Sequence, residues 1–254
     1  MCDAAGLVGG SEAAAHTTVL EIGPGTGALT REILARGAKV VAIEADARAI
    51  STLEEIFVDE IARGQLTIYH HDARDLSELS QFGLTNHSYI CISNIPYYLS
   101  GLLFRQLLDT ECQPKNLVFL IQKELAERIA RDTKASLLSL SVRAFGTPSY
   151  ICTIKKGHFT PPPKVDSAIL AVRDISRSNF LEITSPDFFH LLHLGFGQKR
   201  KQLLSNLVQG EVGERTKIID AFHTLHLKET VRAEDITITQ WIDLAKLLLL
   251  IKNQ

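Results

Sequence analysis

Acidic and amide side chains that can bind a ligand recur along the first hundred residues of the chain. Glu44, Asp72 and Asn94 each follow a short run of apolar and β-branched residues. A carboxylate in the position of Glu44 can accept hydrogen bonds from both hydroxyl groups of a ribose. The Asp72 carboxylate, with Ala73 beside it, can accept a hydrogen bond from an adenine amine. Hydrogen-bond acceptors of this kind after three successive apolar segments predict a ligand-binding site.

A glycine-rich turn precedes these three residues. Gly23, Gly25 and Gly27 alternate with other residues directly behind Glu21. Glycine is needed where the backbone turns sharply and a ligand must approach without a Cβ in its way. The helical pattern that begins at Ala28 would place free N–H groups and the positive end of a helix dipole beside the turn. The spacing differs from the dinucleotide fingerprint and lacks the Gly-Lys-Ser/Thr of a P-loop.

Alternating strand and helix patterns must position these side chains. They predict a Rossmann-like α/β domain with a mostly parallel sheet. Strands are expected at 18–22, 39–43, 66–69, 88–92, 117–121, 150–154 and 168–172, and helices at 28–36, 47–63, 99–108, 122–131 and 136–145. Open sheets of this kind bind ligands at the carboxyl edge of their strands. The alternative interpretation is a domain of the same fold whose polar loop ends bind nothing.

Composition argues against several classes of protein. The 254 residues carry a net charge of −2, so any nucleic-acid binding must come from local basic patches. Four scattered cysteines without a C-x-x-C pair argue against a zinc site or a disulfide framework, and they fit a reducing cytosol. His70 and His71 are adjacent on an expected strand and would face opposite sides, so no metal site is expected. No apolar run approaches the roughly 20 residues of a membrane span, and no signal peptide is evident.

Three longer motifs accompany these spacings. They read N-I-P-Y-Y from Asn94, H-F-T-P-P-P-K-V-D-S-A from His158 and F-G-Q-K-R-K-Q-L from Phe196. The glycine turn and the strand-end residues resemble the class I methyltransferases that use S-adenosylmethionine. The N-I-P-Y motif narrows the match to enzymes that methylate the exocyclic amine of adenine. Together with the other two motifs it is similar to the ribosomal RNA adenine dimethyltransferase family, in its small-subunit branch, over nearly the whole chain from about Asp3.

This resemblance implies roles for the residues around the target base. An adenine amine is a poor nucleophile, so two acceptors that hold its hydrogens help more than a strong base. The side-chain carbonyl of Asn94 and the backbone carbonyl of Ile95 can act in this way, with Pro96 fixing the shape of the loop. Tyr97 would stack on the adenine once it leaves the helix, and Phe159 would stack on its other face.

The resemblance also implies the cofactor and its ligands. S-adenosylmethionine is the expected cofactor, bound by Glu21, Gly23, Gly25, Gly27, Glu44, Asp72, Ala73 and Asn94. Family members carry a Gly-Gln-Asn-Phe-type motif ahead of the first strand, which closes over the cofactor, and no residues here match it. Three explanations stay open: a start site placed late, a fragment, or a chain that lacks this element.

A change to polar composition at residues 173–185 predicts a domain boundary. We expect a class I methyltransferase domain over residues 1–176, with an antiparallel edge to its sheet. Residues 177–254 are expected to form a small all-helical domain that binds RNA.

Basic residues are the candidates for contact with RNA phosphates. Lys199, Arg200 and Lys201 are expected to lie on a helix of the second domain and to make such contacts. Similar candidates near the mouth of the site are Lys155, Lys156 and Lys164. We expect Tyr98, in contrast, to be a packing residue.

The resemblance implies methyl transfer from S-adenosylmethionine to two adjacent adenines, in a hairpin loop near the 3′ end of small-subunit ribosomal RNA, during ribosome biogenesis. The expected partner is this RNA within a pre-ribosomal subunit, and the protein is expected to be a cytoplasmic monomer. One alternative is a large-subunit RNA methyltransferase of the antibiotic-resistance type, which shares N-I-P-Y. Another is an RNA-binding assembly factor that has lost catalysis, which the missing motif would favour.

Overall fold

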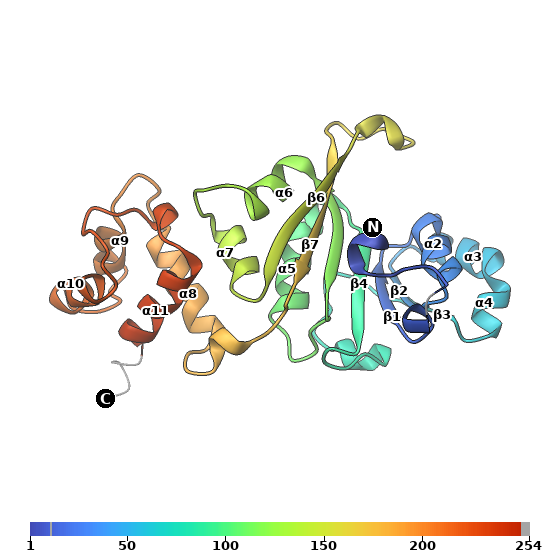
Figure 1. The fold of residues 1–254 in the computed structure, drawn as a ribbon, viewed down its shortest axis with the longest axis horizontal. Helices are drawn as coiled ribbons and strands as arrows, with labels where there is room; N and C mark the ends of the chain where they lie inside the picture. The colour runs from blue at the N-terminus through green and yellow to red at the C-terminus, as the bar shows by residue number, and fades with distance from the viewer. Residues whose placement is uncertain (11, 250–254) are drawn as a thin grey trace. The chain divides into compact units, whose positions relative to one another are not determined.

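The computed structural model describes residues 1–10 and 12–249, and the chain folds into two compact units (Figure 1). The first unit comprises Met1–Ala130 and Gly146–Ile175. The second comprises Arg131–Phe145 and the chain from Ser176 onward. The second unit therefore takes up a segment from the middle of the chain, which differs from the continuous division at residue 176 that composition predicts.

A seven-stranded sheet forms the centre of the first unit, in the order β3-β2-β1-β4-β5-β7-β6. Its strands are β1 (Thr18–Ile22), β2 (Lys39–Glu44), β3 (Leu66–His70), β4 (Tyr89–Asn94), β5 (Leu117–Gln122), β6 (Thr147–Ile154) and β7 (Ser167–Arg173). The first five strands pair in parallel, whereas β7 is antiparallel to β5 and to β6. The predicted mostly parallel sheet with an antiparallel edge is confirmed.

Burial along the strands follows their place in the sheet. In β1, β4 and β5 nearly every residue is buried, as expected for parallel strands that are covered on both faces. The edge strand β6 contains no buried residue and includes Pro148. An edge strand tolerates proline because no further strand needs its N–H group.

The helices of the first unit are α1 (Glu12–Ala15), α2 (Ala28–Ala35), α3 (Ala47–Ile56), α4 (Val58–Ala62), α5 (Ser100–Leu108) and α6 (Lys123–Ala130). The prediction of one helix over 47–63 is wrong, because the backbone of Phe57 leaves the helical region with φ −113° and ψ 31°. Phe57 is 3% exposed, and its ring fills the space beside Gly27, where a Cβ would lie 2.6 Å from it. Tertiary packing of one aromatic ring thus divides the helix.

The first residues of the chain form the short 3-10 helix η1 (Asp3–Ala5). Leu7 is buried in the core of the first unit. Arg173 donates a hydrogen bond of 2.9 Å to the carbonyl of Ala4, and Arg36 pairs with Asp3. These contacts hold the segment against the sheet.

The second unit is helical throughout its described residues, with α7 (Leu137–Arg143), α8 (Ser185–Gly195), α9 (Leu203–Gln209), α10 (Arg215–Thr224) and α11 (Ile238–Leu249). Trp241 is fully buried at its centre and stacks on Phe196 with ring centroids 5.9 Å apart. The expected domain of residues 1–176 includes α7, but Phe145 behind this helix packs on Phe180 with ring centroids 4.8 Å apart. Asn179 also donates to the carbonyl of Ala144 at 2.7 Å. These contacts explain why α7 belongs to the helical unit.

Within residues 1–10 and 12–249, no helix has the length and apolar character that a membrane crossing requires.

Candidate active site

The carboxyl ends of the parallel strands bring the predicted ligand residues to one edge of the sheet. Strands β1 and β2 pair in register from Thr18 with Lys39 to Ile22 with Ile43. Beyond this ladder the Gly23 N–H donates to the carbonyl of Ile43 at 2.9 Å, so the glycine turn begins beside the end of β2. Sequence reasoning alone placed these segments at a common edge, and the register of the strands confirms it.

Two glycines of the turn leave an open surface, and the third serves packing. Gly23, Gly25 and Gly27 have φ values of 66°, 55° and 78°, which L side chains rarely adopt. A Cβ on Gly23 or Gly25 would meet no atom within 4 Å, whereas one on Gly27 would clash with Phe57. The first two positions therefore let a ligand approach the backbone. Gly27 is the N-cap of α2, and no side chain caps the free N–H groups at the start of this helix.

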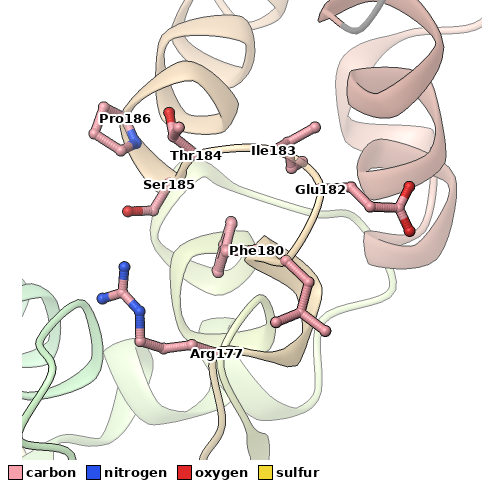
Figure 2. A pocket seen from close by; sticks show the side chains of 8 residues that line it. Arg177, Phe180, Glu182, Ile183, Thr184, Ser185 and Pro186 are labelled. Atoms are coloured by element: carbon pink, nitrogen blue, oxygen red, sulfur yellow. The ribbon is translucent and has the colours of Figure 1, made fainter.

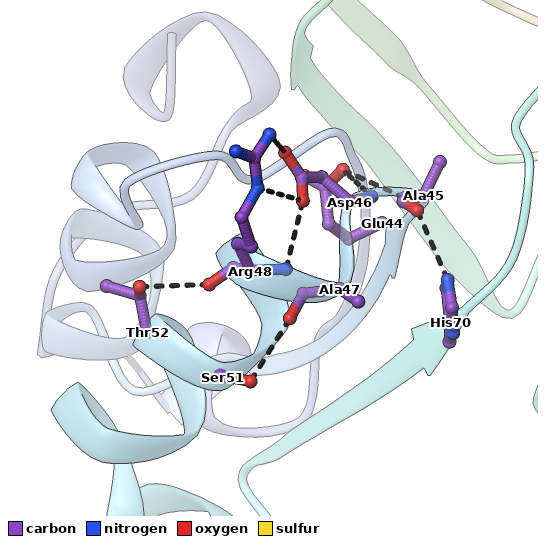
Figure 3. Close-up of polar contacts among 8 residues, drawn as sticks. All are labelled: Glu44, Ala45, Asp46, Ala47, Arg48, Ser51, Thr52 and His70. Atoms are coloured by element: carbon purple, nitrogen blue, oxygen red, sulfur yellow. Dashed lines mark hydrogen bonds and ion pairs between the residues drawn. The ribbon is translucent and has the colours of Figure 1, made fainter.

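The Glu44 carboxylate is held in place by three backbone N–H groups, and Figure 3 shows the two that come from Ala45 and Asp46. Gly25 donates to Oε2 at 3.2 Å, and Ala45 and Asp46 donate to Oε1 at 2.8 and 3.0 Å. A carboxylate offers about four acceptor positions. Glu44 therefore keeps capacity for further donors, such as hydroxyl groups, while its orientation is already fixed.

The loop after β3 carries a second exposed carboxylate. Hydrogen bonds from Arg74 hold the pKa of Asp72 down at about 2, so this group is ionised and accepts hydrogen bonds at neutral pH. The Arg74 Nη2 atom lies 2.5 Å from Asp72 Oδ2. Ala73 between them is half-buried.

The neighbouring histidines are engaged with the backbone and not with each other. The Nε2 atom of His70 lies 3.1 Å from the carbonyl oxygen of Ala45 (Figure 3), and that of His71 lies 2.5 Å from the carbonyl oxygen of Asp75. No metal-binding group of histidine, cysteine, aspartate and glutamate occurs in the described part of the chain.

Glu21 lies beneath the glycine turn and not on its open side. Its side chain is 1% exposed and accepts a hydrogen bond of 2.7 Å from the Thr30 hydroxyl. Burial raises the pKa of this carboxyl to about 7. This contact joins β1 to α2, the two elements that the glycine turn connects. Glu21 would therefore affect a bound ligand only indirectly, by holding the turn in position.

A cavity of about 310 Å³ is lined by Asn94, Ile95, Pro96, Tyr97, Phe159, Pro161 and Pro163. The structure thus joins the loop after β4 with a segment more than 60 residues later, so that Tyr97 and Phe159 line the same cavity. The volume is at the lower end of small-molecule pockets, which suits a single base. Pro161 and Pro163 belong to the H-F-T-P-P-P motif, but neither was predicted as a site residue. The restricted backbone of proline gives this wall of the cavity a rigid shape.

Two fully buried serines lie near the ends of β4 and β7, and neither was among the predicted site residues. The Tyr97 hydroxyl lies 2.7 Å from Ser167 Oγ, and Ser167 is fully buried at the start of β7. Ser93, also fully buried, accepts a hydrogen bond of 2.8 Å from the Ile22 N–H and so continues the contact of β1 with β4. The signal for Ser167 was its place in the sequence K-V-D-S-A, directly before a buried run.

The basic residues of the second unit lie on a turn, so the prediction that they lie on a helix is wrong. Helix α8 ends at Gly195 and α9 begins at Leu203, with Lys199, Arg200 and Lys201 exposed between them. Asn206, 5% exposed, donates to the carbonyls of Gly195 at 2.6 Å and Gln198 at 3.2 Å. This buried amide satisfies the carbonyls that a continuing helix would otherwise have bonded.

The other basic candidates differ in how they are held. Lys155 pairs with Asp166 at 3.2 Å, and the Lys156 N–H donates to the same carboxylate at 3.0 Å. These contacts close the hairpin between β6 and β7. Lys164 is exposed on that hairpin.

A second hollow, of about 250 Å³, lies in the helical unit at the start of α8 (Figure 2). It is lined by Arg177, Phe180, Leu181, Glu182, Ile183, Thr184, Ser185 and Pro186. None of the residues predicted to bind cofactor, base or RNA lines it, so it has no part in the site described above.

Comparison with known proteins places this geometry in a family. A family model described as "Ribosomal RNA adenine dimethylase" matches residues 5–249. The chain belongs to the ribosomal RNA adenine dimethylase family. It is therefore an S-adenosylmethionine-dependent methyltransferase that acts on adenine in ribosomal RNA.

Several relatives of this adenine dimethylase carry one name. "Ribosomal RNA small subunit methyltransferase A" from Dehalococcoides mccartyi is 35% identical over 225 residues, which are 88% of this chain and 76% of that protein. The protein of the same name from Nostoc sp. is 34% identical over 258 residues, with coverage of 95% and 91%.

Solved structures show the same fold. A dimethyladenosine transferase from Plasmodium falciparum superposes with a TM-score of 0.78 at 27% identity, over 99% of this chain and 93% of that one. The 23S rRNA methyltransferase ErmE superposes with a TM-score of 0.69 at 20% identity, over 92% and 91%. The class I methyltransferase fold is thereby confirmed.

The residues present fit the cofactor of this family. The open backbone at Gly23 and Gly25 provides a cradle that a Cβ would fill. Glu44 and Asp72 are acceptors of the kind that the ribose and adenine of S-adenosylmethionine require. When bound, the cofactor supplies an electrophilic methyl group on a positively charged sulfur.

Proposed function

We propose that this dimethylase methylates the N6 amines of two adjacent adenines in a hairpin loop near the 3′ end of small-subunit ribosomal RNA, within a pre-ribosomal subunit in the cytoplasm. The single observation that carries the chemistry is the base-sized cavity between the Asn94–Tyr97 loop and Phe159. The choice of the small subunit is supported by relatives 34–36% identical over 88–95% of this chain, whose names state that substrate.

Cofactor binding is assigned to the sheet edge. The Glu44 carboxylate accepts hydrogen bonds from the ribose hydroxyls, for which its three N–H contacts have already oriented it. The Asp72 carboxylate accepts one from the adenine amine of the cofactor, and the half-buried Ala73 borders that position. The backbone of Gly23 and Gly25 borders the rest of the molecule, with Glu21 and Gly27 supporting the turn from behind.

The target amine is held by two acceptors from the loop after β4. The exposed Asn94 side chain and the backbone carbonyl of Ile95 accept its two hydrogens, which lets the nitrogen become pyramidal and direct its lone pair at the methyl group. Pro96 limits the conformations of this loop. Since the amine is oriented and not deprotonated before attack, no strong base is required.

The target base is held between two rings. Tyr97 stacks on one face and Phe159 on the other, after the adenine has left the RNA helix. The hydrogen bond of 2.7 Å from the Tyr97 hydroxyl to buried Ser167 fixes the plane of the first ring. Orientation of a reactant in this way lowers the entropic part of the barrier.

RNA phosphates are assigned to the turn of Lys199, Arg200 and Lys201, which are exposed side by side. Such contacts position RNA without reading its sequence. We propose that the protein acts as a monomer, since one chain carries both the cofactor residues and the base cavity.

The test uses methyl transfer from labelled S-adenosylmethionine to small ribosomal subunits that lack methylated adenines, with large subunits as the second substrate. Wild-type protein should label the small subunits, and Asn94→Ala should lower kcat at saturating cofactor by about a hundredfold or more. Asn86→Ala, an exposed asparagine on another loop of the same unit, is the matched control. Preferential labelling of large subunits would contradict the substrate, and binding without transfer would support the non-catalytic alternative.

A further inference from the structure

The ring of Tyr98 is 83% exposed, so the prediction that it is a packing residue is wrong. It directly follows Tyr97, whose side chain lines the base cavity. Adjacent residues of one short 3-10 helix, η3 (Tyr97–Leu99), thus send one ring to the cavity and one to solvent. A single exposed apolar residue is common on protein surfaces, so exposure alone assigns no role.

The backbone that carries Tyr98 is held on both sides. The Leu99 N–H donates to the carbonyl of Pro96 at 2.9 Å, and the Ser100 hydroxyl donates to that of Tyr97 at 2.9 Å. Ser100 is 1% exposed, and the Tyr97 hydroxyl is bonded to Ser167. The same hydrogen bonds therefore hold the backbone of Tyr98 and that of Tyr97, whose ring lines the cavity.

Apolar and cationic side chains follow Tyr98 in the chain. Leu102, 39% exposed, comes four residues later, and the exposed Arg105 follows Leu102 by three, so Leu102 and Arg105 share one face of α5. Gln106 of α5 donates at 2.7 Å to the carbonyl of Arg74, which joins the loop after β3 to this helix. We call Tyr98, Leu102, Arg105 and Arg74 the Tyr98 surface.

Arg74 lies in the loop after β3, which the Gln106 hydrogen bond joins to α5. The pKa of its guanidinium is raised mainly by its hydrogen bonds with Asp72, and the Tyr98 phenol adds to that rise. The Arg74 side chain is 72% exposed. An exposed aromatic ring flanked by cations is the composition with which proteins bind unpaired nucleotides: the ring stacks on a base and the cations neutralise the backbone.

We propose that the Tyr98 surface is a second base-binding site, on which the nucleotide next to the target adenine stacks. The proposal rests on the proposed function, because it requires an RNA substrate. When the target adenine enters the cavity, its neighbour in the strand loses a stacking partner. Tyr98, one residue from Tyr97, presents a replacement ring at the rim, and Arg105 and Arg74 lie where the connecting phosphates can be neutralised.

This site gives a reason why two adjacent adenines can be modified by one cavity. While one adenine occupies the cavity, the surface holds its neighbour, so the strand remains bound when the two exchange. Stacking uses the face of a base, whereas methylation changes the amine on its edge. The Tyr98 ring can therefore accept an adenine both before and after methylation.

The first measurement is steady-state methylation of small ribosomal subunits by Tyr98 variants. Tyr98→Ala should raise KM for the subunits about tenfold, within a range of roughly 5- to 100-fold, while kcat on saturating subunits and affinity for S-adenosylmethionine stay the same. Tyr98→Phe keeps the ring and should behave as wild type. Leu181→Ala is the matched control, because Leu181 is 85% exposed but lies in the second unit.

The second measurement is fluorescence of Tyr98→Trp. The chain contains one tryptophan, Trp241, which is fully buried. Emission from position 98 can therefore be obtained by subtracting the wild-type signal. Addition of a short adenine-rich RNA single strand should quench it, because a base stacked directly on the indole deactivates its excited state.

The outcomes separate this inference from the proposed function. If wild-type protein methylates small subunits and Tyr98→Ala keeps KM within twofold, the second site is overturned and the function stands. If Tyr98→Phe is weakened as much as Tyr98→Ala, or the indole is not quenched, stacking is overturned. If wild-type protein transfers no methyl group to either subunit, the proposed function fails and the second site fails with it.

Discussion

Glu21 is a carboxyl group that the fold keeps almost free of water. Its pKa is raised from 4.5 to about 7 by burial, against the smaller opposing effect of the Thr30 hydroxyl. Between these two pH values the folded chain keeps a proton that the unfolded chain releases. Stability must therefore fall as pH rises through this window, in the opposite direction to that of a salt-bridged carboxylate.

Replacement by the neutral amide should remove this loss. Glu21→Gln can still accept from Thr30, so at pH 5 its free energy of unfolding should be close to that of wild type. At pH 8 the variant should be more stable by up to about 3 kcal/mol, since one pKa unit corresponds to about 1.4 kcal/mol. Urea denaturation at both pH values tests this, with exposed Glu55→Gln as control. A wild-type stability that rises from pH 5 to 8 relative to the variant would contradict the assignment.

A second prediction at the residue scale follows from the contact of Tyr97 with Ser167. Tyr97→Phe keeps the ring but leaves the fully buried Ser167 hydroxyl without its described partner, at a cost of about 1–3 kcal/mol of stability. Because the ring is also less well oriented, kcat should fall about ten- to hundredfold. Combining it with Ser167→Ala should restore part of the stability and none of the kcat.

Urea denaturation and methyl-transfer rates of the two single variants and the double variant measure this coupling. Tyr150→Phe is the control, since its hydroxyl contacts Thr153 at 2.6 Å elsewhere on the same sheet edge. Strictly additive stabilities in the double variant would show that the two hydroxyl groups do not interact.

At the scale of elements, hydrogen bonds fix the backbone of the basic turn between α8 and α9, which carries three exposed cations. The Asn206 amide holds it at two carbonyls, and Gln198 donates to Gln209 at 2.8 Å across its base. Backbone order of this kind reduces the entropy that RNA binding must remove from the protein.

Replacing Lys199, Arg200 and Lys201 together by Gln should weaken binding to small subunits and flatten its salt dependence. The slope of log affinity against log salt should drop by roughly 0.7–0.9 for each RNA phosphate that the variant no longer neutralises. Cofactor affinity should not change, because its residues all belong to the first unit. Filter binding at several salt concentrations gives the slope.

The matched control replaces Arg215, Lys217 and Lys228, which are also exposed cations of the second unit, by Gln. An equal effect of both triple variants would mean that net charge matters and the turn does not. The phosphate-binding residues would then be sought at Lys156 and Lys164.

At the scale of the whole molecule, the second unit is built from two separate stretches of chain. Phe145, from the middle of the chain, is 3% exposed and packs on Phe180 and Phe189 with ring centroids at 4.8 and 6.1 Å. A division of the chain at residue 176 would separate these rings.

Phe145→Ala should therefore destabilise the second unit by about 3–5 kcal/mol. The fluorescence of Trp241, the single tryptophan of the chain, reports the unfolding of that unit. The control is Phe82→Ala, a 4% exposed ring of the first unit that packs on Tyr69. Equal shifts of the Trp241 transition in both variants would contradict separate units.

Local pattern predicted the strands, the glycine turn and the strand-end acids, because alternation, burial and turn chemistry act over a few residues. It did not predict the break at Phe57, the place of α7 or the turn at Lys199–Lys201. Each of these depends on a contact that is distant or specific: a ring against Gly27, a cluster around Phe145, an amide from Asn206.

The residues of the candidate site also fall into those that the sequence predicts and those that only the structure identifies. Asn94, Tyr97 and Phe159 were found through motifs, and the structure adds the cavity that joins them. The local pattern marked Ser167 only as a residue before a buried run, because its bond to Tyr97 depends on where β7 lies relative to the loop after β4. The exposure of Tyr98 had no signal in that pattern.

The strand order at the antiparallel edge also sets a sequence of events during synthesis. Strand β6 leaves the ribosome before β7, yet its only neighbour in the seven-stranded sheet is β7, which lies between it and β5. A nascent chain that ends before residue 167 therefore carries β6 with no place to pair. Strand β6 can therefore join the sheet only with β7 or after it, and Phe159, Pro161 and Pro163 lie in the connection between the two strands. The wall of the base cavity is thus completed late, after every residue proposed to bind the cofactor has already been made.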